Sequence, residues 1–423
     1  MISYVSDERS DSKVDLWLLM LVLLLSVNPF FTSYRWVKML LLLFVFLWYG
    51  MRRNFRFRLD RKMVVVFLVI GALALIQGII WEFSLLSLIT VFAFEFLIPF
   101  YLFKIFQFRF LQLLERAIFG LTAISLVIWS LHELIHPMRA LIISVIDFLH
   151  PYSSESVIEG GIRRSMMLYT LMYEHTMMPF GVYRNSGFCH EPGGLAVFAN
   201  LGLFISLISG RPLSSFRNLV YIFAVVSTFS TAGFISLFFI LFIVIFQMKR
   251  IDLIIIIALV LMPLVIFAYN NLSFMGGKIS GQFQNQYEMT LESATTGRLF
   301  GARKSLNVLI NHPISGRGLL AVSRPTLSND PEFAAYGWLS EVSRFGLIIG
   351  LYGFFLFFIG FKICVQYYSR SKIVFFLGVI SLLISLSSQV YLTNPVIFTF
   401  VFIALYKKNL PNLKIIDTYK QAT

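Results

Sequence analysis

The chain has 423 residues, of which 58% are apolar and only 13% are charged, and its mean hydropathy is +0.81. Soluble domains carry about 25% charged residues, so this composition excludes an ordinary soluble enzyme, a disordered chain and a disulfide scaffold. The net charge of +14 comes from residues that punctuate long apolar runs, so it indicates membrane topology and not nucleic-acid binding.

The apolar runs predict an all-α polytopic integral membrane protein, because about 20 apolar residues cross a bilayer core as a helix. The first apolar run follows an N-terminal stretch that is too long and too acidic for a signal peptide. The run itself lacks a small-residue cleavage site, so we expect it to remain as a membrane helix. The predicted spans are 16–34, 36–51, 63–81, 83–103, 117–135, 192–210, 253–269, 336–360, 373–390 and 395–406.

The apolar stretch 218–247 is long enough for one tilted helix or two short ones. Basic residues flank it on both sides, at 211–217 and 249–250, and a single crossing would place one of these clusters outside. A break at the small polar residues 227–233 returns the chain to the same side, provided that protein or a wet cavity covers the freed backbone groups. The expected total is therefore about 12 transmembrane helices.

Basic residues set the orientation of these spans. The connections on one side and the C-terminal tail hold 20 basic and four acidic residues, whereas the short connections on the other side hold only Arg35 and Lys38. The positive-inside rule therefore places both termini in the cytoplasm. The basic segments are 52–62, 104–116, 211–217, 248–252, 361–372 and 407–423.

Two connections on the outer side are long, and they divide the chain into regions. The first contains 139–150, which predicts an amphipathic helix that lies on the membrane surface or packs on the helix bundle. The regions are an N-terminal five-helix membrane region (1–135), a first large periplasmic loop (136–191), central membrane helices (192–269), a second large periplasmic loop (270–335), and C-terminal membrane helices with a cytoplasmic tail (336–423).

Motifs for metals and nucleotides are missing from the sequence. The six histidines do not have the spacing of a zinc site, and Pro137 directly follows the one pair that is four residues apart. No Walker-type or dinucleotide-binding glycine loop is present, and no cytoplasmic domain is long enough to hold one. We therefore expect no cofactor, no metal and no use of ATP or nucleotide sugars.

Arginine and lysine are enriched in the two outer loops. Guanidinium groups suit bidentate contacts with phosphate oxygens, so this enrichment indicates an anionic substrate. Anionic lipid head groups or neighbouring glutamates are the alternative partners for any single arginine. The residues are Arg139, Arg163, Arg164, Arg184, Lys278, Arg298, Arg303, Lys304, Arg317 and Arg324, followed by Arg344 in the next helix.

The segment 184–194 leads the first outer loop into a membrane helix. Pro192 suits the first helical position, and the glycines on both sides of it allow close approach of another backbone or a ligand. Glu191 therefore lies at the positive end of a helix. Its carboxylate either stabilises that helix start or acts as a base or an arginine-orienting group.

Ionisable side chains inside the predicted spans are a second candidate group, since such residues are costly in a membrane and face a cavity or a functional site. Glu341 and Arg344 are three residues apart, so they can pair on one helix face. Glu95 lies mid-span, where a structural hydrogen bond to another helix is its expected role. His132 and Glu133, near the end of span 117–135, have the same two possible roles: a functional site or a structural hydrogen bond.

Three segments carry a resemblance to a known family. The pattern R-x-x-G-x-x-x-E-P at 184–192 resembles the segment that precedes a central membrane helix in O-antigen polymerases. GRLFGARKSLNVLINHPISGRG at 297–318 and SEVSRFGLIIGL at 340–351 resemble an outer loop and the next helix of the wider O-antigen polymerase and ligase superfamily, and the broken helix at STFSTAG fits as well. Ligases of this superfamily usually carry a His-Asn pair where this chain has Ala335 and Tyr336, which weakens the ligase alternative.

The resemblance implies a GT-C-like, metal-independent glycosyltransferase of the bacterial inner membrane. Its substrate would be an undecaprenyl-pyrophosphate-linked oligosaccharide at the periplasmic leaflet. The implied catalytic residues are Glu191, as the first candidate for the proton acceptor, Arg184 and Glu341. The implied pyrophosphate-binding residues are Arg298, Arg303, Arg317, Arg344 and Arg164, and the implied sugar-binding residues are Tyr336 and Trp338, for which aromatic enrichment at the membrane boundary is the alternative explanation.

The implied function is that of an O-antigen polymerase, which transfers the growing glycan from its lipid pyrophosphate to the next lipid-linked repeat unit. A flippase for the same lipid-linked oligosaccharide, and an O-antigen ligase, are the alternatives. Membrane lipids and a chain-length regulator protein are the further expected partners, and nucleic acid is not expected.

Overall fold

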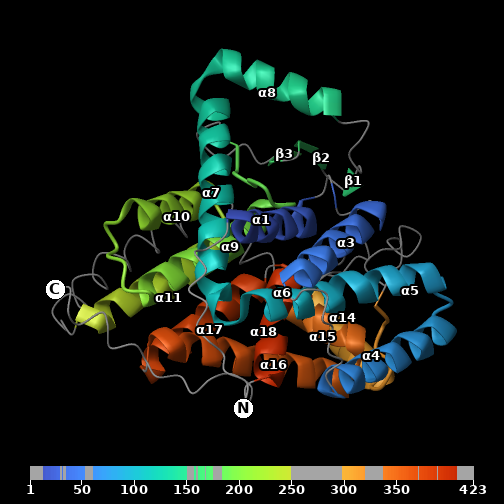
Figure 1. The fold of residues 1–423 in the computed structure, drawn as a ribbon. Coiled ribbons are helices and arrows are strands. Elements are labelled where there is room, and N and C mark those ends of the chain that lie inside the picture. Colours follow the sequence, from blue (N-terminus) through green and yellow to red (C-terminus); the bar gives the residue numbers. More distant parts are fainter. Residues whose placement is uncertain are drawn as a thin grey trace.

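The computed structural model describes most of the helical part of the chain. Helices dominate it, as the sequence predicts, and one small sheet accompanies them (Figure 1). The predicted span 253–269 lies outside the described residues. The described residues are 13–28, 31, 35–52, 61–149, 157–158, 161–166, 168–174, 183–248, 298–319, 337–369, 371–387 and 389–406.

The N-terminal region contains helices that match the predicted spans. Ser84 caps the fourth of them by accepting a hydrogen bond from the Ser87 backbone N–H at 3.3 Å. That helix then widens into a π-helical segment around Glu95 before it continues as α6. The elements are α1 (Lys13–Val27), α3 (Arg35–Arg52), α4 (Arg61–Ile80), α5 (Leu85–Phe92), the π segment (Ala93–Leu97), α6 (Ile98–Phe106), a 3-10 turn (Gln107–Arg109) and α7 (Phe110–Leu134).

The first predicted outer loop contains a helix and a sheet. Helix α8 (His136–Leu149) confirms the helix expected at 139–150, and it begins after a single extended residue, Ile135. Strands β1 (Val157–Ile158), β2 (Gly161–Met166) and β3 (Tyr169–Glu174) form an antiparallel sheet in the order β1-β2-β3, with Arg164 opposite Leu171. This sheet is an addition to the all-α architecture that the sequence predicts.

The central helices are α9 (Pro192–Ile208), α10 (Phe216–Ser227) and α11 (Thr231–Met248). The helix break predicted at 227–233 is confirmed between α10 and α11, where Phe229 has φ +46°. The serine and threonine side chains at this break bond nearby backbone carbonyls, with Thr228 Oγ1 donating to the Val225 carbonyl at 2.6 Å. Local hydrogen bonding of this kind offsets the helix bonds that the break removes.

The C-terminal region differs from the prediction at one point. The expected single span 336–360 is two helices, α15 (Gly337–Phe345) and α16 (Leu347–Tyr368), separated by Gly346 with φ +78°. A side chain at Gly346 would collide with the Ile314 carbonyl, so the turn 312–316 packs into the break. The remaining helices are α14 (Arg298–Asn311), α17 (Lys372–Ser387) and α18 (Pro395–Leu405).

Among the described residues, four helical segments are long and apolar enough to cross a membrane: 61–80, 85–106, 110–134 and 347–368. Helices α9, α10, α11, α17 and α18 are apolar but shorter. The chain is therefore a membrane-spanning helical protein, and the twelve crossings predicted from sequence are not confirmed by the described residues.

Long-range polar contacts join helix ends that the alternating topology places on the same side. At the predicted outer end, Asn28 Nδ2 donates to the Phe188 carbonyl at 3.1 Å. At the predicted cytoplasmic end, Arg52 pairs with Asp15, Lys62 Nζ donates to the Leu405 carbonyl at 3.3 Å, and Glu115 pairs with Arg211 at 2.8 Å and Arg217 at 3.1 Å.

Helices α16 and α18 pack closely in the core. Gly360 of α16 lies so close to the Phe400 carbonyl of α18 that any side chain would collide with it, a close approach that small residues allow in membrane helices. Phe357 and Phe361 pack edge-on against the Phe400 ring at 5.7 and 5.8 Å. This packing fixes the direction of α18, which begins directly after the polar segment 389–394.

Candidate functional site

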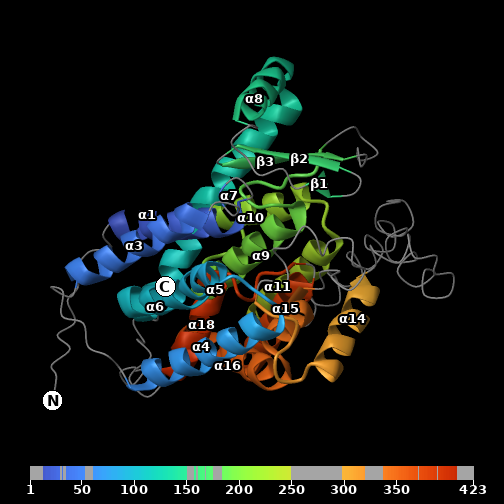
Figure 2. The same cartoon turned by 90° about the vertical axis from the view of Figure 1, so that its right-hand side faces the viewer.

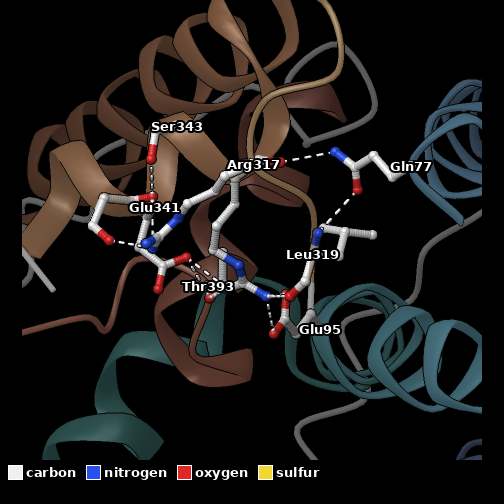
Figure 3. A network of polar contacts seen from close by, with 9 residues as sticks. Gln77, Glu95, Arg317, Leu319, Glu341, Ser343 and Thr393 are labelled. Carbon is white, nitrogen blue, oxygen red and sulfur yellow. Dashed lines mark hydrogen bonds and ion pairs between the residues drawn. The ribbon is translucent and has the colours of Figure 1, made fainter. Parts of the chain in front are cut away.

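Arg344, at the end of α15, is the centre of a buried network (Figure 3). Its Nη2 donates to both Glu95 carboxylate oxygens at 2.9 and 3.1 Å and to the Leu319 carbonyl at 2.6 Å. Its Nη1 donates to Glu341 Oε2 at 2.8 Å and to Thr393 Oγ1 at 2.9 Å. Hydrogen bonds that join charged partners away from water are among the strongest in proteins, so this network fixes Arg344 in one position.

Glu95 reaches Arg344 from the π-helical segment of the predicted span 83–103. The interhelical hydrogen bond expected for Glu95 is therefore confirmed, with α15 as the partner. One-turn π segments inside α-helices occur frequently at functional sites. Here the π segment coincides with the acidic residue that approaches the network.

Arg317 lies in the turn that joins α14 to the following segment, and it contacts the same helix end. Its backbone N–H donates to the Ser343 carbonyl at 2.9 Å, and its guanidinium donates to the Ser340 hydroxyl. Burial, followed by the positive charge of Arg344, lowers the pKa of the Arg317 guanidinium to about 10, while Glu341 opposes the shift. Because burial and Arg344 both penalise its charge, an anion beside Arg317 would be stabilised there.

Two glycines make this turn possible. Gly316 and Gly318 have φ values of +60° and +94°, a conformation that residues with a side chain rarely adopt. A side chain at Gly316 would also collide with the Ser343 carbonyl, and one at Gly318 with the Phe83 ring. The two glycines therefore allow the turn to bring Arg317 into contact with α15.

Gln77 of α4 braces this turn and is fully buried. Its Nε2 donates to the Ser315 carbonyl at 2.6 Å and to the Arg344 carbonyl at 2.8 Å, while its Oε1 accepts from the Leu319 backbone N–H at 3.0 Å. One amide thus satisfies three backbone groups from two segments. The ion-pair cluster, meaning Glu95, Arg317, Glu341, Arg344 and Thr393, is held against α4 by this side chain.

An apolar groove of about 260 Å³ ends at the ion-pair cluster. Helices α4 and α16, which form two of its walls, lie side by side in both views (Figures 1 and 2). Among its lining residues, Glu341 and Thr393 bring polar groups from the cluster. The groove is lined by Val65, Val66, Val69, Ile70, Phe96, Glu341, Val342, Phe345, Ile349, Gly350, Tyr352, Gly353, Phe354, Leu356, Leu392, Thr393, Phe398, Val401, Phe402 and Leu405.

Three buried polar atoms of the cluster have no hydrogen-bond partner among the described residues: Glu341 Oε1, Arg317 Nε and Arg344 Nε. Buried polar groups in proteins normally have at least one hydrogen-bond partner. The cluster therefore retains one acceptor and two donors, and the residue that carries the acceptor, Glu341, lines the groove.

Arg184 and Glu191 lie in a second polar region, at the start of α9. Arg184 Nε donates to the Thr228 carbonyl at 3.0 Å, so this segment packs on the break between α10 and α11. Asn185 strengthens the contact through its backbone N–H and Nδ2, which donate to Ser227 O and Oγ, both at 2.9 Å. Glu191 occupies the N-cap position of α9 in an extended conformation, and its side chain makes no capping hydrogen bond.

The segment 389–394 connects the two polar regions. Gln389 packs on Gly193 and Tyr391 on Gly194, so closely that a side chain at either glycine would collide with them. Four residues after Gln389, the Thr393 hydroxyl donates to Glu341 Oε2 at 2.8 Å. The glycines that follow Glu191 therefore let α9 approach the segment that also contacts the ion-pair cluster.

Three helices beside the two polar regions are shorter than a bilayer core. At 1.5 Å per residue, α9, α10 and α18 are about 25, 18 and 16 Å long, less than the roughly 30 Å of a bilayer core. The opposite ends of α9 and α10 adjoin the basic connection 211–217, so their deficit falls at the predicted outer end. Gly187 packs against Ser125 of α7, and α7 continues about 13 Å beyond it.

The structure brings Arg317, Glu341 and Arg344 of the predicted site together, and places Arg184 and Glu191 at the neighbouring region. Arg303 is exposed on α14, Arg298 begins α14 and Arg164 lies in β2. Trp338 stacks on Phe354 with ring centres 4.9 Å apart, so one of its faces is occupied. Tyr336 lies outside the described residues.

Two residues of the site were missed by the sequence reasoning. Gln77 is a polar residue inside the apolar run 63–81. Polar residues inside a membrane span are costly and often mark a functional site, so its position could have identified it. Thr393 gives no comparable signal, because it directly precedes the Asn394-Pro395 helix start.

A further polar group lies where α7 ends. His132 Nδ1 lies 2.7 Å from Glu133 Oε1, and Glu133 Oε2 accepts from the Tyr183 backbone N–H at 3.2 Å. The Tyr169 ring lies beside His132, and burial, followed by the charge of Glu133, raises the pKa of its phenol. These contacts attach the residue before Arg184 to α7.

Within the described part of the chain, no group of three His, Cys, Asp or Glu side chains is arranged to hold a metal ion. Comparisons with protein-family models, curated proteins and solved structures find no match to this chain. The functional argument therefore depends on the geometry of the site and on the resemblance of the three short segments.

Proposed function

We propose that this protein is a membrane glycosyltransferase that polymerises a surface polysaccharide. It would transfer the growing glycan from undecaprenyl pyrophosphate to the next lipid-linked repeat unit at the periplasmic leaflet, without a metal ion. The observation that carries the proposal is the apolar groove that ends at a buried cluster of two arginines and two carboxylates. A substrate with a long hydrocarbon tail and an anionic head matches this arrangement.

The groove suits the tail of such a substrate. Its lining is almost wholly apolar, and part of a polyprenyl chain fits in about 260 Å³. Each methylene group moved out of water gains about 0.8 kcal/mol, but a lipid tail is already out of water in the bilayer. The groove would therefore align the tail and bring the head group to the cluster.

Arg317 is the proposed contact for the pyrophosphate. Arg344 is held by Glu95 and Glu341, whereas the Arg317 guanidinium donates to Ser340 alone among the described carboxyl, hydroxyl and carbonyl groups. A cation fixed beside the leaving group stabilises the negative charge that develops as the sugar–phosphate bond breaks. Arg344 would position Glu341 and add positive potential.

Glu341 is the proposed proton acceptor. Its Oε2 is held by Arg344 and Thr393, and its Oε1 remains available beside the groove. In the proposed step, an acceptor hydroxyl forms a bond to the anomeric carbon of the donor sugar and its proton passes to Glu341. The bond from that carbon to the pyrophosphate oxygen breaks, and the lipid pyrophosphate leaves with the electron pair. Glu191, the first candidate from sequence, is the alternative base.

Reconstitution tests the proposal. Purified protein in liposomes that contain lipid-linked repeat units, with EDTA and without nucleotides, is expected to produce a ladder of glycan lengths. Strict dependence on a metal or a nucleotide would contradict the proposal. Movement of the substrate between leaflets without elongation would identify a flippase, and transfer only to lipid A core would identify a ligase.

A further inference from the structure

Helix α4 contacts both parts of the candidate site, the apolar groove and the turn that carries Arg317. Val66 and Ile70 of this helix line the groove. Gln77, seven residues beyond Ile70, bonds backbone groups on both sides of Arg317 (Figure 3). Residues seven positions apart lie two turns apart on the same face of a helix. One face of α4 therefore runs from the groove to the turn.

The half of α4 that walls the groove is loosely packed. None of the described residues 61–69 is buried, and Val65 and Val69, which line the groove, are 52% and 49% exposed. Phe67 packs edge-on against one phenylalanine ring of α5 and one of α6, with ring centres 5.4 and 5.8 Å apart. A hydrocarbon chain in the groove would add contacts to a wall that has few of its own, and many small dispersion contacts sum to a large total.

The other half of α4 is held firmly. The four buried residues of the helix all lie between positions 70 and 77. The amide of Gln77, the last of them, bonds the carbonyls of Ser315 and Arg344 and the backbone N–H of Leu319. Buried hydrogen bonds are costly to leave unmade. A displacement of α4 therefore either carries the turn with it or breaks these bonds.

Arg317 lies between the two residues of the turn that Gln77 holds. Ser315 is two positions before it and Leu319 is two positions after it. The turn also contacts α15 directly, because the Arg317 backbone N–H donates to the Ser343 carbonyl at 2.9 Å. The Gln77 bonds tie this turn to α4, so their opening removes the support on that side of Arg317.

We propose that Gln77 is a positioning residue that couples occupancy of the groove by a polyprenyl chain to the position of Arg317. A chain in the groove packs against Val66 and Ile70 and stabilises the position of α4 in which the Gln77 bonds form. A ligand that binds one arrangement of a protein lowers the population of the others by mass action. The inference rests on the proposed function, in which this chain is the tail of the substrate and Arg317 contacts its pyrophosphate.

Hydrogen exchange tests the coupling on the full-length protein in lipid nanodiscs. The probe is undecaprenol, which has the polyprenyl tail but no phosphate that could contact Arg317 directly. Exchange is measured by mass spectrometry in peptides that cover 315–319, because the Leu319 N–H bonds Gln77 Oε1 and exchanges when that bond opens. The parent protein is compared with Gln77→Met, and Leu75→Met is the matched control on the exposed side of the same helix.

Undecaprenol at about ten times its Kd is expected to slow exchange of the Leu319 amide by up to about tenfold in the parent protein and in Leu75→Met. No slowing is expected in Gln77→Met. Unchanged exchange in the parent protein overturns the inference, and so does equal slowing in Gln77→Met. Glycan elongation without this protection overturns the inference alone, whereas protection without elongation overturns the proposed function alone.

Kinetics with shortened tails separate positioning from a merely structural role. Binding energy from a remote part of a substrate is expressed in kcat when it helps to form the reactive arrangement. In the parent protein, a lipid-linked repeat unit with a shortened tail is therefore expected to lower kcat and to raise KM. In Gln77→Met, kcat is expected to be low and equal for both tails, while the difference in KM remains. A kcat that still depends on tail length in Gln77→Met contradicts the coupling.

Discussion

Arg344 and Glu95 are 249 positions apart in the chain, and two hydrogen bonds of 2.9 and 3.1 Å join them. Glu341 shares the same guanidinium from one helical turn away, at 2.8 Å. A carboxylate that the sequence places in the middle of an apolar span is thereby paired with a cation from a segment near the other end of the chain. This pairing joins the N-terminal and C-terminal helices at the candidate site.

Removing one partner of this pair is expected to destabilise the protein strongly. Glu95→Gln or Arg344→Gln alone leaves a buried charge with fewer partners, which typically costs about 3–5 kcal/mol when a buried pair is broken. The double variant Glu95→Gln/Arg344→Gln is expected to lose less than the sum of the two single losses. Chemical unfolding in detergent micelles measures all four proteins, and additive losses would show that the two groups are not coupled.

Gln77→Met is expected to lower stability because it leaves three buried backbone groups without their partner. Each orphaned buried group costs about 1–3 kcal/mol. Leu75→Met on the same helix is the matched control, since Leu75 is exposed and surface substitutions usually stay within about 0.5 kcal/mol. Gln77→Glu is expected to resemble Gln77→Met, because a carboxylate cannot donate to the Ser315 and Arg344 carbonyls.

Thermal unfolding of the three variants and the parent protein tests the Gln77 brace. A Tm for Gln77→Met that equals that of Leu75→Met would contradict the role assigned to this amide. A Tm for Gln77→Glu that matches the parent would show that the two donor contacts contribute nothing.

Filling the apolar groove is expected to weaken binding of the lipid-linked substrate. An added Cβ at Gly353 meets no atom within 4 Å, so Gly353→Phe places its ring in the groove without a backbone clash. Because the ring occupies volume in which the tail would be aligned, KM is expected to rise severalfold. Elongation assays at varied substrate concentration measure the change.

Gly71→Phe is the control for the groove, because Gly71 also has open space around it but does not line the groove. Its KM is expected to remain at the parent value. Equal effects of the two substitutions would mean that the groove does not hold the tail.

Substitution of Arg317 is expected to lower kcat, whereas filling the groove is expected to raise KM. Arg317→Gln removes the cation proposed for the leaving group, and the loss in kcat is expected to be about 10²–10³-fold. Arg317→Lys keeps the charge but loses the planar fork, so an intermediate rate is expected. Single-turnover elongation with saturating donor separates these effects from binding.

Glu341→Gln is expected to lower kcat and to remove the pH dependence that a proton acceptor gives to the rate. Glu191→Gln provides the comparison, since Glu191 is the alternative base. A full loss in Glu191→Gln together with normal turnover in Glu341→Gln would reverse the assignment.

The sequence by itself determined the class of the protein and much of its outline. Long apolar runs and the distribution of basic residues predict helices that cross a membrane, because hydropathy and charge act locally on each segment. The break at 227–233 followed from the same argument, as did the helix at 139–150. Glu341 and Arg344 were identified as candidates because charged residues inside membrane helices are costly, and Arg317 because arginine is enriched in the predicted outer loops and suits phosphate.

Only the tertiary structure decided which of these charges meet. Glu95 and Gln77 join the cluster through contacts that no local pattern encodes, since their partners lie more than 200 positions away. The division of 336–360 at Gly346 depends on the turn 312–316, which packs into it. The link between the two polar regions likewise depends on the segment 389–394, which packs on Gly193 and Gly194 and bonds Glu341, and these contacts are a property of side-chain packing between distant helices.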